Sequence, residues 1–392
     1  MLDWMIDNKW ILLFYFILII IIYVKRNKFE FQAKFIALYK TKLGLNLMER
    51  ISKKYREFIK ILGYIGVGIG FIGMIFIFVT LVYLLWGLIF TPETTQGVSL
   101  IIPGVRMPNS VFVPFVYGIL SIFIIAAIHE LAHGIVARAW KIPVLSSGIV
   151  FFGPIIGAFV EPDDKKLNRK PDIEQYSVFA AGPFVNIVFA FLMLLILMIG
   201  APMVSNAYYD GVLISNVVNA SPAFVAGLPS NVVLESINGY EVNNVKDLNE
   251  GLGHIRVGDE LTFDYIDNDQ SYEKTITVGD KEGNPYIGFY AQANLKYSED
   301  HLGYKIATWF FGDLRKAGLA AWGLLSWLMN LSLAIGLINL LPLGPTDGGR
   351  MIYLATKKMF KNGEKIYSHI SFTSLMILLA CLLLSYAKPL FM

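Results

Sequence analysis

Two histidines and a glutamate lie close together in an apolar stretch, within the segment His129-Glu130-Leu131-Ala132-His133. Residues four apart lie on the same face of a helix, so both imidazoles can bind a single zinc ion. Glu130 is placed to take a proton from a zinc-bound water and to pass it to a leaving amine. The segment therefore indicates hydrolytic chemistry, with His129 and His133 as metal ligands and Glu130 as the catalytic base.

The same three residues have a structural alternative. The histidines could hydrogen-bond to neighbouring helices, and Glu130 could pair with Arg138 or Lys141 at the membrane edge. Ionisable side chains inside a membrane are costly unless they pair, bind a metal or face water. Two imidazoles and a carboxylate in one apolar helix favour the metal site.

A catalytic zinc takes three protein ligands and leaves a fourth position for water. Cys381 is the single cysteine and lies in the last apolar stretch, so the third ligand must be His, Asp or Glu. Asp347 is the candidate, because Pro and Gly residues break an apolar segment at its position. The alternative is that Asp347 belongs to a turn that leaves the membrane. Such ligands also suit iron or cobalt, and the motif favours one Zn2+ ion.

The elements that carry these residues are expected to be membrane helices. Hydrophobic residues make up 55% of the 392 and charged residues 16%, and the mean hydropathy is +0.56, which excludes an ordinary soluble protein. A spanning helix needs about 20 apolar residues. The candidate spans are 10–24, which could instead be a signal anchor, 61–90, 111–140, 177–204, 317–343 and 369–389. The formal charge of +3 gives no reason to expect a nucleic-acid partner.

The charge distribution predicts how the chain crosses the lipid bilayer. Residues 25–60 hold 11 Lys and Arg against 3 Glu, so the positive-inside rule places them in the cytoplasm. With six spans, both termini and residues 205–303 lie outside, while His129 and Asp347 lie near the cytoplasmic side. We therefore expect a multi-pass protein of the cell membrane whose active site faces the cytoplasm.

Residues 205–303 form a polar region with 15 acidic and 5 basic residues. Short β-branched runs separated by Gly, Asn and Asp predict strands in a small α+β domain. Asn238-Gly239 predicts a hairpin between 233–237 and 240–242, and residues 246–251 predict a short helix.

Residues 145–160 are apolar but contain Gly148, Gly153, Pro154 and Gly157, which disfavour a helix. They predict strands at membrane depth, where irregular backbone needs cover from protein or a watery cavity. A loop at the level of the lipid headgroups is the alternative.

Three separated motifs resemble those of the site-2 protease family of intramembrane zinc metalloproteases. These are a His-Glu-x-x-His, an Ala-Gly-Pro-x-x-Asn and an Asn-x-x-Pro-x-x-x-x-Asp-Gly, whose aspartate is the third zinc ligand in that family. The matching residues are His129, Glu130 and His133, then 181–186, then Asn339, Pro342, Asp347 and Gly348. The resemblance covers residues 119–350.

The resemblance implies a polytopic α-helical membrane fold of about six transmembrane helices with a membrane-embedded Gly-rich β element. It implies endoproteolysis in or near transmembrane segments of single-span or previously trimmed membrane proteins. Asn186 and Asn339 would hold the substrate strand or the developing oxyanion, unless they are buried asparagines that join helices. The Gly-rich segment could pair with an unwound substrate backbone.

Residues 221–228 and 232–242 also resemble PDZ domains of bacterial-type proteases. Residues 209–212 would then form the loop that binds a peptide C-terminus, with Gly211 and Val212 in it. The chain departs from the usual pattern, because Asn231-Val232 stands where such domains have Gly-Asp. A steric filter that excludes large ectodomains is the alternative to peptide binding.

The sequence thus predicts four regions. They are an N-terminal transmembrane region with its basic loop (1–110), a catalytic membrane core in two parts (111–204 and 304–392), and the extracytoplasmic PDZ-like domain (205–303). A divalent-metal transporter and an inactive relative that binds membrane proteins are rival functions. The scarcity of polar residues in the spans argues against the first, and Glu130 argues against the second.

Overall fold

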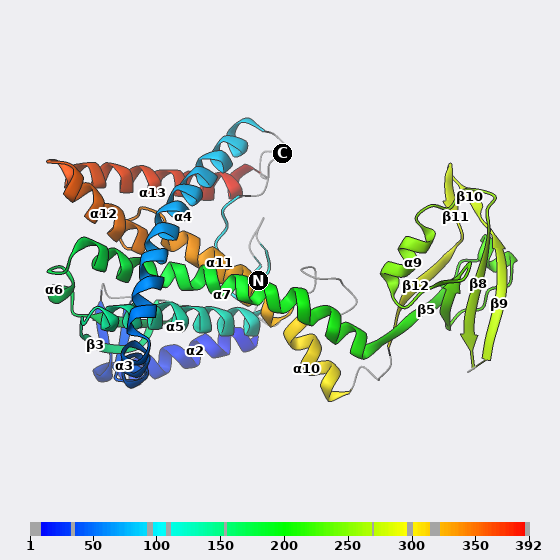
Figure 1. Ribbon diagram of the computed structural model, residues 1–392, viewed down its shortest axis with the longest axis horizontal. Helices are drawn as coiled ribbons and strands as arrows, with labels where there is room; N and C mark the ends of the chain where they lie inside the picture. The colour runs from blue at the N-terminus through cyan, green and yellow to red at the C-terminus, as the bar shows by residue number, and fades with distance from the viewer. Residues whose placement is uncertain are drawn as a thin grey trace. The chain divides into compact units, whose positions relative to one another are not determined.

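The computed structural model describes residues 9–32, 36–91, 97–106, 111–152, 155–268, 270–295, 301–313 and 322–388. The chain forms two compact units (Figure 1). The first comprises 1–194 and 327–392, and the second comprises 195–326.

The helices of the first unit range from single turns to long apolar helices. In chain order they are α2 (Lys9–Val24), the 3-10 turn η1 (Arg26–Lys28), α3 (Leu45–Lys54), α4 (Arg56–Phe90), α5 (Phe115–Ala139), α6 (Asp164–Leu167), α7 (Asp172–Tyr208), α11 (Leu324–Asn339), α12 (Asp347–Met359) and α13 (Gly363–Ala387). Helix α7 continues into the second unit. Among the described residues, α4, α5, α7 and α13 are long and apolar enough to cross a membrane.

The prediction of about six spans is therefore not confirmed. Helix α2 has 16 residues, so its axis is about 24 Å long and falls short of a hydrocarbon core of about 30 Å. Helix α11 also has 16 residues and ends at Asn339, before Pro342 and Gly344 interrupt the helical backbone. The predicted start of that span, at 317, lies outside the described residues.

Helix α4 packs closely on its neighbours through a stripe of glycines. These are Gly63, Gly66, Gly70 and Gly73, which are all buried. A Cβ atom built at Gly63 would lie 3.1 Å from the Cβ of Ser177, and one at Gly66 would lie 3.3 Å from the ring of Phe184. Ser177 and Phe184 belong to α7, so small residues let the two backbones approach, as is usual for membrane helices.

A four-stranded antiparallel sheet lies beside α5. Its strands are β1 (Glu30–Gln32), β2 (Ile36–Thr41), β3 (Val144–Phe152) and β4 (Ile155–Pro162), in the order β1-β2-β3-β4. The strands predicted within 145–160 are confirmed, whereas β1 and β2 were not expected in the basic segment. Gly148 of β3 is required here, because a Cβ atom would lie 2.0 Å from the carbonyl oxygen of Tyr39 on β2. Among the described strands β4 pairs with β3 alone, so it is an edge strand.

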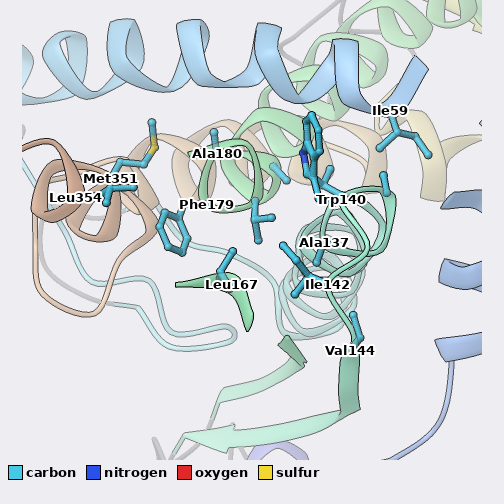
Figure 2. Close-up of a cluster of buried hydrophobic side chains, with 14 of the residues drawn as sticks. Ile59, Ala137, Trp140, Ile142, Val144, Leu167, Phe179, Ala180, Met351 and Leu354 are labelled. Atoms are coloured by element: carbon cyan, nitrogen blue, oxygen red, sulfur yellow. The ribbon is translucent and has the colours of Figure 1, made fainter. Parts of the chain in front are cut away.

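A buried hydrophobic cluster joins α4, α5, α7 and α12 (Figure 2). Side chains from all four helices point into it, together with residues that connect α5 to β3. Its labelled members are Ile59, Ala137, Trp140, Ile142, Val144, Leu167, Phe179, Ala180, Met351 and Leu354. The cluster holds the start of α12 against α7 and α5, although more than 200 residues separate α5 from α12 in sequence.

The second unit contains a β-rich domain, residues 209–295, which we call the β domain. Its strands are β5 (Tyr209–Val217), β6 (Val232–Ile237), β7 (Tyr240–Glu241), β8 (Glu260–Asp267), β9 (Gln270–Thr277), β10 (Gly279–Lys281), β11 (Asn284–Tyr286) and β12 (Phe289–Leu295). Its helices are α8 (Pro222–Val225) and α9 (Val245–Leu252), and α10 (Leu302–Phe311) follows it. The main sheet has the order β12-β5-β6-β8-β9, with β7 also on β6.

The local predictions for the β domain are confirmed. Strands β6 and β7 form the expected hairpin, with Asn238 and Gly239 at φ of 50° and 75°, as a type I′ turn requires. Helix α9 covers the predicted 246–251, and the side chain of Asn244 caps it by accepting hydrogen bonds from the N–H groups of Lys246 and Asp247.

Candidate metal centre

Three ligand atoms converge where α5 meets the start of α12. The Nε2 atoms of His129 and His133 lie 3.1 Å apart. Oδ2 of Asp347 lies 3.1 Å from Nε2 of His129 and 3.3 Å from Nε2 of His133. The structure therefore brings the three sequence-predicted ligands into one group that could hold a metal ion.

The spacing of these atoms fits a small tetrahedral cation. Ligand atoms about 2.0 Å from a tetrahedral zinc lie roughly 3.3 Å apart, which is close to the three observed separations. The side chains of His129 and His133 are 8% and 11% exposed, so the group is shielded from bulk solvent. Two nitrogens and one carboxylate oxygen are also a donor set typical of catalytic zinc.

His133 is oriented by the backbone of α7. Its Nδ1 lies 2.7 Å from the carbonyl oxygen of Val178, so Nδ1 carries the proton and donates it to that oxygen. The lone pair of Nε2 is then free for the metal. A backbone carbonyl behind a ligating histidine is a common device for fixing the tautomer.

His129 is backed by the amide group of Asn186, also on α7. An amide nitrogen of Asn186 lies 3.1 Å from Nδ1 of His129, and Asn186 is fully buried. When Nε2 binds a metal, Nδ1 carries the proton, and the amide then presents its oxygen by rotating about its last side-chain bond. Asn186 is therefore placed to position His129, whereas its predicted contact with substrate stays a prediction.

We expect replacement of Asn186 by leucine to lower zinc affinity about 10- to 100-fold, because His129 loses the group that fixes its tautomer. Asn186→Asp should restore most of the affinity, because a carboxylate also accepts from Nδ1. Asn46→Ala, on the exposed face of α3, is the control. Zinc titration against a competing chelator measures the effect. Equal losses in the leucine and aspartate variants would mean that Asn186 only fills space.

Asp347 is held at the first position of α12 by a tight turn. Thr346 precedes the helix, and its Oγ1 accepts a hydrogen bond of 3.1 Å from the N–H of Gly349. Cβ atoms at Gly348 and Gly349 would lie 2.1 Å and 1.6 Å from the carbonyl oxygens of Leu340 and Leu343. The two glycines thus let the chain fold back on itself and aim the carboxylate at the histidines.

Glu130 faces the sheet rather than a basic side chain. Its Oε2 accepts a hydrogen bond of 2.9 Å from the N–H of Val160 on β4. The alternative partner Arg138 pairs with Glu49 of α3 instead. The glutamate is therefore anchored beside the ligand group, with its charge not neutralised by the arginine.

A cavity of about 430 Å3 opens onto the ligand group. His129, His133, Asp347 and Glu130 line it, together with Asn339 and Arg350. Four residues of the edge strand β4 form one wall, namely Gly157, Phe159, Val160 and Pro162. Asn339 therefore lies where a substrate contact was predicted, although that contact itself stays a prediction.

Gly182 lies against the ligand group, at a position to which the sequence analysis assigned no role. A Cβ atom at this point of α7 would lie 2.4 Å from Nε2 of both His129 and His133. The space that a metal ion needs beside the two imidazoles thus depends on the absence of a side chain at Gly182. Gly182 was visible as the second residue of the Ala-Gly-Pro-x-x-Asn motif, and only the interhelical distance shows what it does.

The predicted peptide loop forms the start of strand β5. The N–H of Gly211 donates to the carbonyl oxygen of Asn243 at 3.1 Å, and Val212 is fully buried. Strand β5 lies between β12 and β6, so a peptide could not add to it without displacing one of them. Capture of a peptide C-terminus at Gly211 and Val212 stays a prediction.

The sequence is similar to those of several known proteins. A family model described as peptidase family M50 matches residues 117–381. An uncharacterized protein of Methanocaldococcus jannaschii is 30% identical over 250 residues, which are 62% of this chain and 63% of that protein. Zinc metalloprotease RasP of Shouchella clausii is 24% identical over 51% of this chain and 54% of its own length. A putative zinc metalloprotease of Clostridium perfringens is 27% identical over 60% of this chain and 85% of its own.

The matches to the first two of these relatives therefore span little more than half of their lengths. Among solved structures, the PDZ domain of an SdrC-like protein from Listeria monocytogenes matches 21% of this chain and 88% of that domain. Its sequence identity is 26% and the TM-score is 0.20.

Proposed function

The chain belongs to peptidase family M50, and from this premise we propose that it is an intramembrane zinc endopeptidase. It hydrolyses peptide bonds in or near the transmembrane segments of other membrane proteins. One observation carries the proposal. Glu130 lies beside three convergent metal ligands, in a helix long and apolar enough to cross a membrane.

The residues of the site have different roles in the proposed reaction. A zinc ion on His129, His133 and Asp347 would lower the pKa of a bound water toward neutrality. Glu130 would take a proton from such a water and deliver it to the leaving amine. The N–H of Val160 holds the carboxylate in place for both transfers.

The wall formed by β4 supports an extended substrate. A helical substrate hides its carbonyl groups in hydrogen bonds, so it has to unwind before attack. An edge strand can bind the unwound backbone by strand addition, and β4 offers its edge beside the ligand group. Asn339, on the same cavity, is the proposed donor to the substrate backbone or to the developing oxyanion.

The proposed topology places the active site toward the cytoplasm and the β domain outside. It rests on the basic residues of 25–60 and on the acidic character of 205–303. The substrates are then single-span or previously trimmed membrane proteins, cleaved in a regulated pathway. For the β domain we favour a steric role that excludes large ectodomains, because Gly211 and Val212 lie in an interior strand.

The test is cleavage of a panel of single-span membrane proteins by the purified protein in lipid. Removal of metal by a chelator should abolish cleavage, and stoichiometric zinc should restore it. Asp347→Asn should weaken zinc binding by at least about tenfold. A direct metal ligand contributes more to zinc affinity than a residue that only hydrogen-bonds to a ligand. Asp280→Asn, in the β domain, is the matched control. If the protein bound zinc tightly but cleaved no substrate, the proposal would be overturned in favour of a metal transporter or a protein that only binds membrane proteins.

A further inference from the structure

A second cavity, of about 640 Å3, adjoins the catalytic one. It lies between α6, the first turns of α7 and one face of α12. Phe179 and Arg350 line both cavities, and Phe179 is drawn beside Leu354 of the second cavity in Figure 2. The two cavities therefore share a wall directly beside the ligand group.

The lining of the second cavity is strongly basic. Its cationic residues, which define what we call the basic pocket, are Arg169, Lys170, Arg350, Lys357 and Lys358. The carboxylates in the lining are Asp164 and Asp172. Helix α12 presents Arg350, Tyr353, Leu354 and Lys357 on one face, because these positions follow the helical spacing of three and four.

The lysines of the basic pocket already have acidic partners. Lys170 pairs with Glu174 at 3.0 Å, Lys358 with Asp172 at 3.4 Å, and Lys357 with Glu364 at 3.3 Å. The two arginines differ from them. Within the described part of the chain no carboxylate forms an ion pair with Arg169 or Arg350, and the Arg350 guanidinium lies 5.6 Å from the ring centre of Phe179.

The path of β4 connects the two cavities. Gly157, Phe159, Val160 and Pro162 of this strand line the catalytic cavity, and the chain then turns at Asp163 into α6. Asp164 and Asn168, just beyond this turn, line the basic pocket. A substrate strand that lies along β4 past the metal ligands therefore reaches the basic pocket with its flanking residues.

We propose that the basic pocket binds an acidic side chain of the substrate, a few residues from the scissile bond, and that Arg350 and Arg169 donate the hydrogen bonds. This inference rests on the proposed protease function and adds a specificity-determining site to it. Guanidinium groups bind carboxylates through two parallel hydrogen bonds, which lysine cannot do. Asp or Glu in the flank thus favours cleavage, whereas Lys or Arg, common at the cytoplasmic ends of spans, opposes it.

The experiment compares reporters that differ by one flanking residue. Single-span reporters carry Asp, Asn or Lys at successive positions on either side of the cleaved bond, and kcat/KM is measured for each in neutral-lipid vesicles. The readout is the ratio of kcat/KM for the Asp reporter to kcat/KM for the Asn reporter, measured with the same enzyme. A general loss of activity lowers both values equally and cancels in this ratio. For the wild-type protein we expect a ratio of about 10 at one or two adjacent positions, the size of a charge-assisted hydrogen bond.

Variants of the two arginines identify the donors. Arg350→Gln and Arg169→Gln should each bring the ratio toward one, whereas Lys361→Gln, an exposed lysine outside the pocket, should keep it near 10. Arg169→Glu should in addition speed cleavage of the Lys reporter relative to the Asn reporter. Misfolding cannot produce such a gain.

The outcomes separate this inference from the proposed function. A ratio of one in the wild-type protein, with cleavage that still depends on Glu130, would overturn the acidic-flank site and leave the protease intact. If cleavage of every reporter were independent of Glu130, the proposed protease function itself would be overturned. A third result, in which anionic phosphatidylglycerol vesicles change all rates equally through the two arginines, would assign the pocket to a lipid headgroup and reject the substrate.

Discussion

Replacement of Glu130 by glutamine is expected to lower kcat about 100- to 10,000-fold, the usual contribution of a positioned general base. The amide keeps the size of the side chain and can still accept the hydrogen bond from the N–H of Val160. It cannot take a proton from water. The fold and the three metal ligands should remain as they are, so the loss is one of chemistry and not of structure.

The measurement pairs single-turnover cleavage with the zinc content of the same sample. Glu130→Gln should retain about one zinc per chain while cleavage is lost. Glu57→Gln is the control, because its side chain is 77% exposed and its pairing with Lys60 at the surface adds little stability. If Glu130→Gln cleaved its substrates normally, the proposed acid–base role would be wrong, whatever the metal content.

The second large effect is expected at Gly182, where alanine should reduce both zinc affinity and cleavage by more than about 100-fold. The new methyl group would lie 2.4 Å from Nε2 of His129 and of His133, well inside van der Waals contact. It would occupy the space between α5 and α7 and force the imidazoles apart. The expected loss of zinc affinity exceeds the loss from removing a hydrogen bond to a single ligand, because both histidines are displaced together.

The matched control is Gly68→Ala on α4, where an added Cβ atom would meet nothing within 4 Å. Alanine favours a helix more than glycine does, so this variant should be neutral or slightly more stable. Bound zinc and thermal unfolding are measured for both variants. Normal zinc binding by Gly182→Ala would show that the helices separate easily, and the close approach would then not be a requirement of the site.

The three residues of the candidate metal group could be predicted from the sequence, because each is marked by the spacing or by the helix-breaking residues around it. The spacing of His129 and His133 fixes their common face, and the Pro and Gly residues around Asp347 mark a turn in an apolar segment. The strands at 145–160 followed in the same way from glycines that disfavour a helix. These features depend on neighbours in the chain, which a sequence displays directly.

The remaining features depend on residues that are distant in sequence. The role of Gly182 comes from the distance between α5 and α7, and the role of Val160 comes from the seating of β4 against α5. Strands β1 and β2 lie in a basic segment whose strand character appears only in the sheet, where β1 pairs with β2 and β2 pairs with β3, more than 100 residues later. The count of about six spans is not confirmed for a related reason, because apolar composition alone does not show where α2 and α11 begin and end.

The separation of the ligands along the chain also sets an order of events during biosynthesis. His133 and Asp347 are 214 residues apart, so at about 5–20 residues per second the ribosome adds the third ligand roughly 10–40 s after the second. During that interval two histidines and Glu130 are present without the carboxylate that completes the metal group. On the proposed function, the nascent chain therefore does not cleave neighbouring membrane proteins until α11 and α12 have been added.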